Sequence, residues 1–367
     1  MKPLFSFIIA VSSFSCCVAQ QQNNEPVEKR NVISADNPNI QYVGRISYKN
    51  PKAPQFGYTA SQIYANFTGT SLSMIMKPNS GYFMVELDGK PAYKVQSLAD
   101  SVVTIAKGLT PGNHSVSITQ CDEAVLVKFP TFHGFILDDN AAIGEKPVLP
   151  ERRIEFIGNS ITCALGIEDT TPAHNASPAI QYQNAYYSYA AQTARRLNAQ
   201  YMVVARSGIG VYRNNGGNRY GDTKVMPYYY PHSMFSDNSE MWDFRRYTPD
   251  VVCINLGTND TSQTYETNLL AAGMTKFLKT VHAKYPKAKI VLLTGTMRKG
   301  QRLADLKSAL NTAMQNLKNE GVNDIYRFDF TPADGTLGYG TGLHPSMKQH
   351  GKMADELVPF LKQVMGW

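Results

Sequence analysis

The sequence has little cysteine and no pattern typical of a metal site. Five cysteines occur in 367 residues, and only Cys121, Cys163 and Cys253 lie beyond the first 20 positions. An odd number of thiols cannot all pair within one chain, so we predict no disulfide framework. Neither CxxC nor HExxH is present, and the seven histidines are not spaced as ligands. We therefore expect no structural metal and no other cofactor.

Clustered charge is also absent. Lysine and arginine number 36 against 29 acidic residues, a net charge of +7, but they are scattered without a basic run. A nucleic-acid-binding surface needs basic residues gathered on one face, so we expect no nucleic-acid partner. The 43% hydrophobic and 11% aromatic content can fill buried cores and excludes a disordered chain. A length of 367 residues indicates two domains, or one domain with a large appendage.

No apolar run is long enough to predict a transmembrane span. Lys2 precedes a short apolar run over 4–11, and a small residue stands at position 19. A bilayer core about 30 Å thick needs about 20 apolar residues, so this run predicts an export signal over 1–19 rather than a membrane anchor. Lipidation of Cys16 or Cys17 is an alternative, although no Leu-rich lipobox precedes Cys16. We expect an exported protein that is secreted, periplasmic or lipid-anchored at the cell envelope.

The first large region has the pattern of an all-β domain. Residues 20–38 are polar without periodicity, and we interpret them as a linker. Over 39–148, alternating or β-branched runs recur about every ten residues, with Asn, Asp, Gly and Pro turns between several of them. This spacing favours a β-sandwich, which we expect to be a jelly roll. The expected strands cover 41–48, 62–67, 71–76, 82–87, 101–106, 114–119 and 124–129.

The second region, 151–367, has a different period. Short runs of valine, isoleucine and leucine alternate there with long helical patterns, which predicts a parallel sheet covered on both faces. We expect a three-layer, flavodoxin-like α/β domain whose ligand site lies beyond the carboxyl ends of its strands. The expected strands cover 154–157, 201–205, 251–256, 290–294 and 325–330, and the expected helices 184–197, 264–284, 303–320 and 347–365.

Two polar residues directly follow strands of this sheet. Ser160 comes after the first strand, where its hydroxyl can be exposed at the sheet edge and its backbone N–H offered to an oxyanion. Taken alone, this turn is as well explained by a serine that caps a helix. Asn259 follows another strand, and its side-chain amide is a second candidate donor to developing negative charge. We interpret its neighbour Asp260 as the N-cap of the next helix.

A glycine and a histidine reach the same edge. Gly208 follows the strand over 201–205, where a glycine permits close backbone approach and gives a third N–H donor. His344 lies immediately before the last helix, on a loop that Pro345 helps to fix. Each of these residues has a simple structural explanation. The order Ser, Gly, Asn, His at one edge is much harder to attribute to chance.

These blocks resemble those of the SGNH (GDSL-type) hydrolases. The matching residues are Gly158-Asn159-Ser160, Gly208, Gly257-Thr258-Asn259-Asp260 and His344-Pro345. Upstream matches are Arg45, Phe67-Thr68-Gly69-Thr70, Gly112-Asn113-His114 and Phe132-His133-Gly134-Phe135. With a β-sandwich before the hydrolase domain, the chain resembles carbohydrate esterase family two, the acetyl-xylan-esterase-like deacetylases. The resemblance implies that Ser160 is the nucleophile, that His344 is its base, and that Ser160, Gly208 and Asn259 form the oxyanion hole.

The sequence departs from the superfamily at two places. Asn159 stands where an Asp is usual, which should alter local hydrogen bonding. The acid usually found two or three residues before the histidine is replaced by Gly342 and Thr341. Some members of the family work with a Ser-His dyad oriented by a main-chain carbonyl, and we expect the same here. The alternatives for holding His344 are Asp334, an acid elsewhere in the chain, or a water.

The resemblance implies a serine esterase that removes O-acetyl groups from plant cell-wall polysaccharide such as acetyl xylan or glucomannan. For the sugar contact we favour Trp242, because aromatic faces stack on sugar rings and its connection should overhang the strand ends. One alternative is an SGNH esterase that acts on another short-acyl ester. Another is a carbohydrate-binding protein with weak hydrolysis. The sequence indicates no oligomeric state.

Overall fold

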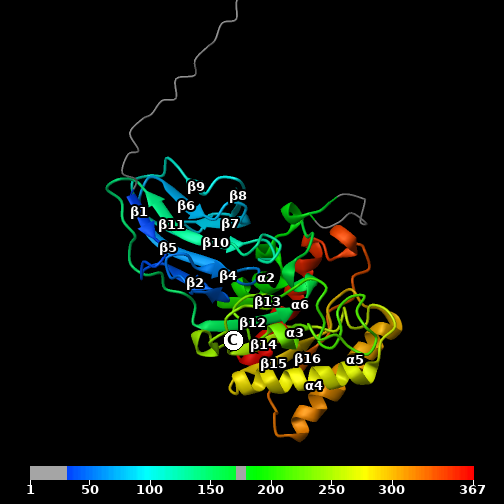
Figure 1. Cartoon of the computed structure of the whole chain (residues 1–367). Helices are drawn as coiled ribbons and strands as arrows, with labels where there is room; N and C mark the ends of the chain where they lie inside the picture. The colour runs from blue at the N-terminus through cyan, green and yellow to red at the C-terminus, as the bar shows by residue number, and fades with distance from the viewer. Residues whose placement is uncertain (1–30, 171–178) are drawn as a thin grey trace, which may run out of the picture. The chain divides into compact units, whose positions relative to one another are not determined.

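The computed structural model describes residues 31–170 and 179–367 (Figure 1). Antiparallel sheets form the first part of the chain, and a parallel sheet with helices forms the second. The export signal expected over 1–19 lies outside the described residues. Within the described ranges, every helix is too short or too polar to traverse a lipid bilayer.

The N-terminal domain is a sandwich of two antiparallel sheets. The first has the order β1 (Asn31–Ser34), β11 (Phe132–Leu137), β6 (Leu72–Met76) and β9 (Val102–Ala106). The second has the order β2 (Gln41–Val43), β5 (Gln62–Gly69), β10 (Gly112–Gln120), β7 (Gly81–Leu87) and β8 (Tyr93–Ser97). A short hairpin adds β3 (Ile46–Ser47) and β4 (Gln55–Phe56). Alternating residues of both sheets, including Ile63, Phe83 and Phe135, fill a core in which each buried side chain contributes about 1.5–3 kcal/mol.

The structure of the sandwich differs from the prediction in two segments, 31–34 and 124–129. Residues 31–34, predicted as linker, form β1, which pairs with β11 through main-chain hydrogen bonds that polar composition does not reveal. The strand predicted over 124–129 is a series of turns, in which Lys128 and Phe129 adopt positive φ angles that a strand cannot contain. The analysis also did not predict β8 or β11.

The C-terminal domain is built on a five-stranded parallel sheet. Its order is β13 (Ala199–Ala205), β12 (Arg152–Gly158), β14 (Val251–Asn255), β15 (Lys289–Leu293) and β16 (Ile325–Phe328). The longer helices are α2 (Tyr189–Arg196), α4 (Thr267–Lys284), α5 (Gly300–Asn319) and α6 (Met347–Met365). Short helical turns are α1 (Ser160–Cys163), η1 (Ile180–Tyr182), η2 (Ala185–Tyr187), α3 (Met226–Tyr229), η3 (Phe244–Arg246) and η4 (Thr341–Leu343).

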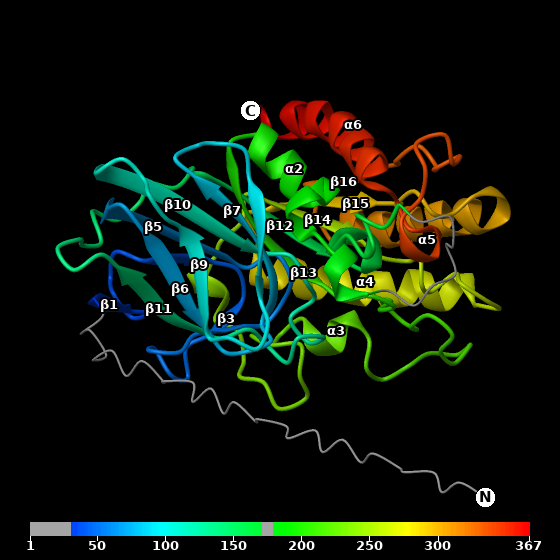
Figure 2. The same ribbon diagram turned by 90° about the horizontal axis from the view of Figure 1, so that it is seen from above.

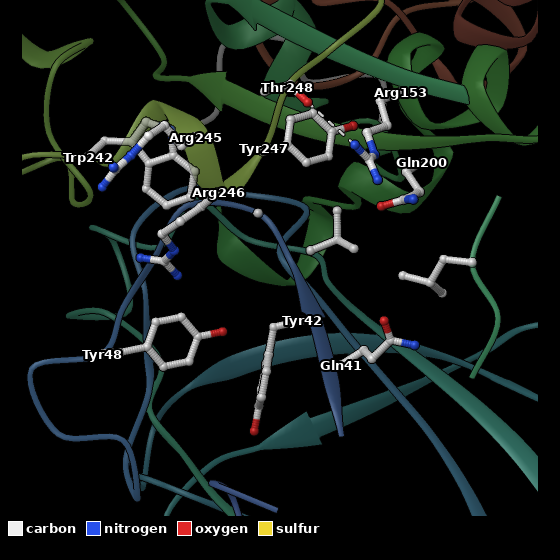
Figure 3. Close-up of a pocket in the computed structure, with 13 residues that line it drawn as sticks. Gln41, Tyr42, Tyr48, Arg153, Gln200, Trp242, Arg245, Arg246, Tyr247 and Thr248 are labelled. Carbon is white, nitrogen blue, oxygen red and sulfur yellow. Dashed lines mark hydrogen bonds between the residues drawn. The ribbon is translucent and has the colours of Figure 1, made fainter. Parts of the chain in front are cut away.

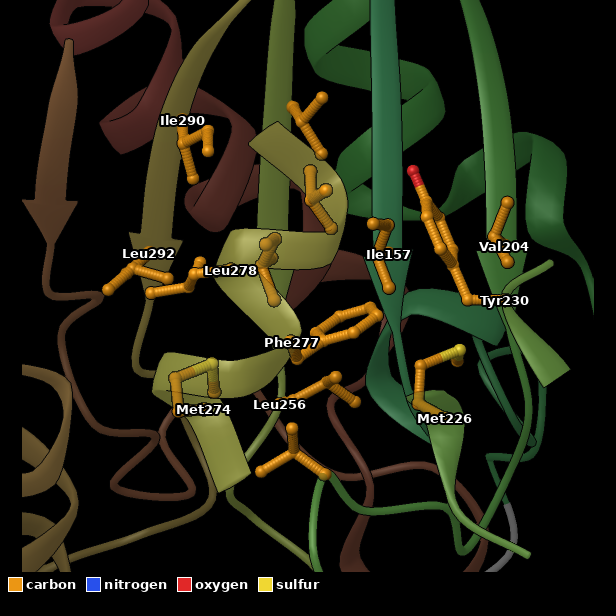
Figure 4. Close-up of a cluster of buried hydrophobic side chains, with 14 of the residues drawn as sticks. Ile157, Val204, Met226, Tyr230, Leu256, Met274, Phe277, Leu278, Ile290 and Leu292 are labelled. Atoms are coloured by element: carbon orange, nitrogen blue, oxygen red, sulfur yellow. The ribbon is translucent and has the colours of Figure 1, made fainter. Parts of the chain in front are cut away.

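The helices cover both faces of this sheet, as Figure 2 shows from above. In β14, Val252 and Ile254 face the layer of α4 and α5, whereas Val251 and Cys253 face the layer of α2 and α6. The predicted three-layer architecture is therefore confirmed. The apolar residues of α4 recur at helical spacing, and Figure 4 shows Phe277 and its neighbours packed on the strands.

A buried ion pair joins the two domains. The Arg45 guanidinium of the sandwich lies 3.0 Å from the Glu155 carboxylate of β12, and both side chains are fully buried. The Tyr230 hydroxyl donates to the same carboxylate at 3.1 Å, and its ring lies 4.5 Å from the guanidinium. Removing either charged partner should cost about 3–5 kcal/mol, because the other would remain buried and uncompensated.

Candidate active site

Three loops leave the sheet at one edge. Gly158 ends β12 and is paired with Ala205 of β13 on one side and with Asn255 of β14 on the other. Carboxyl ends of parallel strands share an edge, so the segments that follow them emerge side by side. These segments carry Ser160, Gly208 and Asn259, respectively.

Ser160 is the first residue of α1, and its placement depends on Asn159. The Asn159 side-chain oxygen accepts from the Ile161 N–H at 3.0 Å and caps the helix, while its amide donates to the Asn255 carbonyl at 3.1 Å. An ionised aspartate has no proton for that second bond, so asparagine ties the turn to β14 directly. A glycine is required at 158, because a Cβ there would lie 2.0 Å from the Thr162 hydroxyl. The turn therefore holds Ser160, 5% exposed, at the sheet edge.

His344 lies within hydrogen-bonding distance of Ser160. Its Nε2 is 2.8 Å from the Ser160 Oγ, and its Nδ1 is 2.8 Å from the carbonyl oxygen of Thr341. A carbonyl only accepts, so Nδ1 carries the proton and Nε2 is free to accept from the hydroxyl. The acceptor is thus the main-chain carbonyl that the sequence analysis favoured. Asp334 is exposed and instead accepts from the Thr336 N–H and hydroxyl at 3.0 and 2.7 Å.

A buried acid supports this loop from behind. The Thr341 hydroxyl donates to Asp169 at 2.6 Å, and the Thr341 N–H donates to the Gly166 carbonyl at 3.2 Å. Leu343, two residues further on, adopts a φ of 61°, a left-handed conformation that is strained for a bulky residue. Asp169 thus orients the carbonyl that holds His344. The sequence analysis missed it because it lies 172 positions from Thr341 and has no motif around it.

Burial lowers the pKa of His344 below its ordinary value of 6.5, although hydrogen bonding to Thr341 and the charge of Glu123 oppose the effect. A general base must be neutral, and protonation of the imidazole removes it. We therefore expect the acidic limb of kcat/KM for an acetyl ester to have its midpoint below pH 6.5. A pH profile in buffers of constant ionic strength checks this. A midpoint above about 7 would contradict the desolvated environment described here.

Gly208 and Asn259 lie on connected loops. Gly208 has a φ of 78°, which favours glycine, and its carbonyl accepts from the Asn215 N–H at 2.8 Å. The Asn259 side-chain amide donates to the carbonyl of Ile209 at 2.7 Å. That bond uses one amide hydrogen and leaves the second for another acceptor. Asn259 is therefore held against the residue that follows Gly208.

Asp260 is not the helix cap that we expected. Helix α4 begins later, at Thr267. Asp260 is fully buried, and one carboxylate oxygen accepts from the N–H groups of Val211, Tyr212 and Arg213 at 2.9, 2.8 and 3.2 Å. Burial raises the pKa of this carboxyl, and the backbone bonds oppose the rise. Asp260 thus fixes the loop that begins at Gly208.

Trp242 is the one predicted site residue that the structure places elsewhere. It is 4% exposed and lines a cavity of about 660 Å³ with Tyr48 and Arg246 (Figure 3). The same cavity is lined by Arg153 and Gln200, which lie at the amino ends of β12 and β13, opposite to the edge that carries Ser160. The expectation that the connection carrying Trp242 overhangs the carboxyl ends of the strands is therefore wrong, and its contact with sugar stays a prediction.

Potential metal ligands are not grouped in the described ranges. There, no three His, Cys, Asp or Glu side chains lie together as they would around an ion. Cys121, Cys163 and Cys253 are free and buried.

Comparison with known proteins matches both domains. The family model "Carbohydrate esterase 2 N-terminal" covers residues 42–147, and the "GDSL-like Lipase/Acylhydrolase family" model covers 156–352. The solved structure of a family two carbohydrate esterase from Clostridium thermocellum, in complex with cellohexaose, is 34% identical with a TM-score of 0.82, and the match covers 89% of this chain and 99% of that one. The chain belongs to carbohydrate esterase family two. It is a carboxylic ester hydrolase with an SGNH domain, as the resemblance implied.

Further relatives extend this membership. "Cellulase/esterase CelE" of Acetivibrio thermocellus is 35% identical over 343 residues, which are 90% of this chain but only 40% of that protein. An "Acetylxylan esterase / glucomannan deacetylase" of Cellvibrio japonicus is 27% identical over the whole length of both chains. A family two carbohydrate esterase structure from Cellvibrio japonicus has a TM-score of 0.81 at 27% identity, over 92% of this chain and 98% of that one.

Proposed function

We propose that the protein is an exported serine esterase that removes O-acetyl groups from plant cell-wall polysaccharide, with acetyl xylan and glucomannan as the leading substrates. The observation that carries the proposal is the Ser160–His344–Thr341 hydrogen-bond chain, with 2.8 Å at each step. Relatives along the whole chain are named acetylxylan esterase and glucomannan deacetylase, which supports the acetyl group and the polysaccharide.

The first half-reaction forms an acetyl-enzyme. His344 Nε2 accepts the Ser160 proton as Oγ bonds to the acetyl carbonyl carbon. The resulting oxyanion accepts hydrogen bonds from the Ser160 N–H, the Gly208 N–H and the free amide hydrogen of Asn259. The bond between the acetyl carbon and the sugar oxygen then breaks, and the imidazolium gives its proton to that oxygen, which leaves as a sugar hydroxyl.

The second half-reaction uses water. His344 accepts a proton from a water molecule, whose oxygen attacks the acetyl carbon and forms a second oxyanion in the same donors. Collapse releases acetate and restores the proton to Ser160. In both halves the Thr341 carbonyl accepts from the imidazole Nδ1–H, which keeps the ring orientation fixed while its charge changes.

Acetate release is the direct test of this function. Purified enzyme is given acetylated xylan, acetylated glucomannan and acetylated cello-oligosaccharides, with p-nitrophenyl acetate, butyrate and octanoate in parallel. We expect release of acetate from at least one polysaccharide and rejection of butyryl and longer esters, because a site specific for acetyl groups has no room for longer acyl chains. Preference for longer or aryl esters would favour the alternative of another acyl substrate, such as a lipid or aryl ester.

The second candidate function is that of a carbohydrate-binding protein with weak hydrolysis, and one observation on a relative favours it. A relative's structure is described in complex with cellohexaose, an unacetylated oligosaccharide. Cello-oligosaccharide affinity measured by calorimetry, beside acetate release, separates the two. Micromolar glycan binding without measurable ester turnover would favour the binding protein.

Export is also part of the proposal. It rests on the pattern of an export signal over 1–19, which lies outside the described residues. Fractionation of cells that express the full chain, with and without Cys16→Ser and Cys17→Ser, distinguishes a soluble exported form from a lipid-anchored one. Membrane association that both substitutions abolish would support the lipid anchor.

Asn259→Ala should lower kcat for acetyl ester hydrolysis by about 10²- to 10³-fold with a smaller change in KM, because its donor bond strengthens as the oxyanion forms. Steady-state kinetics on p-nitrophenyl acetate measure both constants. Because Asn259 also donates to the Ile209 carbonyl, Asn259→Asp is a useful companion, since it keeps the volume but replaces the donor by an acceptor. Equal losses in substrate affinity and turnover would instead indicate a substrate-positioning role.

A further inference from the structure

Glu123 belongs to the N-terminal sandwich, yet its side chain contacts the C-terminal domain near the catalytic serine. It lies after β10, immediately before the segment 124–129 that we had predicted as a strand, and it is 1% exposed. Its Oε2 accepts from the Ser207 N–H at 2.8 Å and from the Arg206 guanidinium at 2.9 Å. Its Oε1 accepts from the Ser207 hydroxyl. A single carboxylate thus holds the two residues that precede Gly208.

Both domains hold Glu123 in place. Its N–H donates to the Gln183 side-chain oxygen at 3.0 Å, and the carbonyl of Cys121 accepts from the Ala185 N–H at 3.1 Å. The neighbouring Asp122 accepts from the Tyr82 N–H of β7 at 2.6 Å, which fastens the same turn to the sandwich. The loop that carries the carboxylate is therefore fixed by hydrogen bonds to the hydrolase domain and to the sandwich.

The contact with Ser207 determines the direction of the next peptide. The N–H of Gly208 belongs to the peptide that starts at the Ser207 carbonyl, so rotation of Ser207 turns that N–H away from the oxyanion. Gly208 has no Cβ, so its backbone is freer to rotate than that of other residues, and it adopts a left-handed φ of 78°. Downstream anchors exist, because the Gly208 carbonyl and the Ile209 carbonyl accept from Asn215 and Asn259. Upstream, the side-chain anchor is Glu123.

The charge of Glu123 has opposite effects on the two charged groups of the reaction, because it favours the protonated imidazole of His344 and disfavours the oxyanion. A carboxylate beside a developing oxyanion repels it, and burial strengthens the repulsion. The Arg206 guanidinium at 2.9 Å offsets that charge, with side chains 27% and 2% exposed for Arg206 and Glu123. The ion pair has no net charge. Glu123 therefore acts mainly by accepting three hydrogen bonds from Arg206 and Ser207, which fix the backbone before Gly208.

We propose that Glu123 is a positioning residue that the sandwich supplies to the hydrolase domain, orienting the Gly208 N–H for the oxyanion. The inference rests on the proposed function, because it requires that Gly208 donates to a tetrahedral intermediate. It assigns the N-terminal domain a part in catalysis, in addition to any part in binding polysaccharide.

The test compares Glu123→Ala and Glu123→Gln with Asp122→Asn in the full chain. Asp122 is the matched control, because it is a buried acid in the same turn whose contact goes to Tyr82 and not to residues 206–208. We measure kcat and KM with p-nitrophenyl acetate, Tm, and the Ki of methylboronic acid, which forms a tetrahedral adduct with a serine hydroxyl. Complete loss of one oxyanion donor costs about 10²- to 10³-fold, so a misoriented donor should cost less.

We expect Glu123→Ala to lower kcat about 10- to 100-fold, with KM changed less than about threefold, and to raise the Ki of the boronate by a similar factor. Glu123→Gln should fall between it and the wild type, because one oxygen still accepts. Asp122→Asn should stay within about threefold of the wild type in all three constants. If Glu123→Ala does not fold, Ser207→Ala removes one of the same contacts, and its expected loss of kcat is about three- to tenfold.

Other outcomes would overturn the proposal. A fall in Tm with kcat and boronate Ki unchanged would make Glu123 purely structural, and so would equal losses in Asp122→Asn. Failure of the proposed function has a different signature, since the wild type itself would then release no acetate from polysaccharide or would prefer longer esters, whatever Glu123 does. An inactive Ser160→Ala beside a fully active Glu123→Ala would refute the positioning role alone.

Discussion

Ser160→Ala is expected to lower kcat for acetyl ester hydrolysis by about 10³- to 10⁶-fold, while Tm stays within about 2 °C of the wild type. The loss is large because no other group can form the acetyl-enzyme, and what remains reflects only the oxyanion donors and binding. The fold should tolerate the change, since the Ser160 hydroxyl contacts His344 at the edge of the sheet. Acetate release and a thermal melt measure the two quantities. Retention of more than a few per cent of activity would refute the nucleophile.

A second serine gives the reciprocal control. Ser188 is the N-cap of α2, and its hydroxyl oxygen accepts from the Ala191 N–H at 3.1 Å. Ser188→Ala should therefore cost about 1 kcal/mol of stability and leave kcat unchanged. If Ser160→Ala lowers activity but not stability, and Ser188→Ala lowers stability but not activity, then the serine at 160 takes part in the reaction itself.

The sequence predicts the C-terminal fold well because its elements are determined by local periodicity. Helix α4 illustrates this, with Leu270, Met274, Phe277, Leu278 and Val281 on one face. The failures lie where long-range contacts decide the conformation. Strand β1 is formed by pairing with β11, and the end of the turns over 124–129 is held by Lys77, whose ammonium donates to the Phe129 carbonyl at 3.0 Å.

The site is predictable to a similar degree, and for a related reason. Ser160, Gly208 and Asn259 each follow a strand, and parallel topology alone brings them to one edge. Asp169 and Glu123 act through residues far away in sequence, so no spacing reveals them. Trp242 was misplaced because the long connection before β14 folds back toward the amino ends of the strands, where Arg246 packs on the indole at 4.6 Å.

The largest effect after Ser160 concerns the histidine and its missing acid. His344→Ala is expected to lower kcat by about 10³-fold or more, because it removes both the general base and the later acid. Asp334→Ala should change kcat less than about tenfold, since its carboxylate accepts from Thr336 and the imidazole Nδ1–H donates to the Thr341 carbonyl at 2.8 Å. A carbonyl stabilises the imidazolium less than a carboxylate does, but it fixes the same tautomer without an additional loop to order. Kinetics of the two variants, with melting curves to verify folding, distinguish the arrangements. Equal losses in both variants with intact folds would show that Asp334 completes a triad, and the dyad would then be wrong.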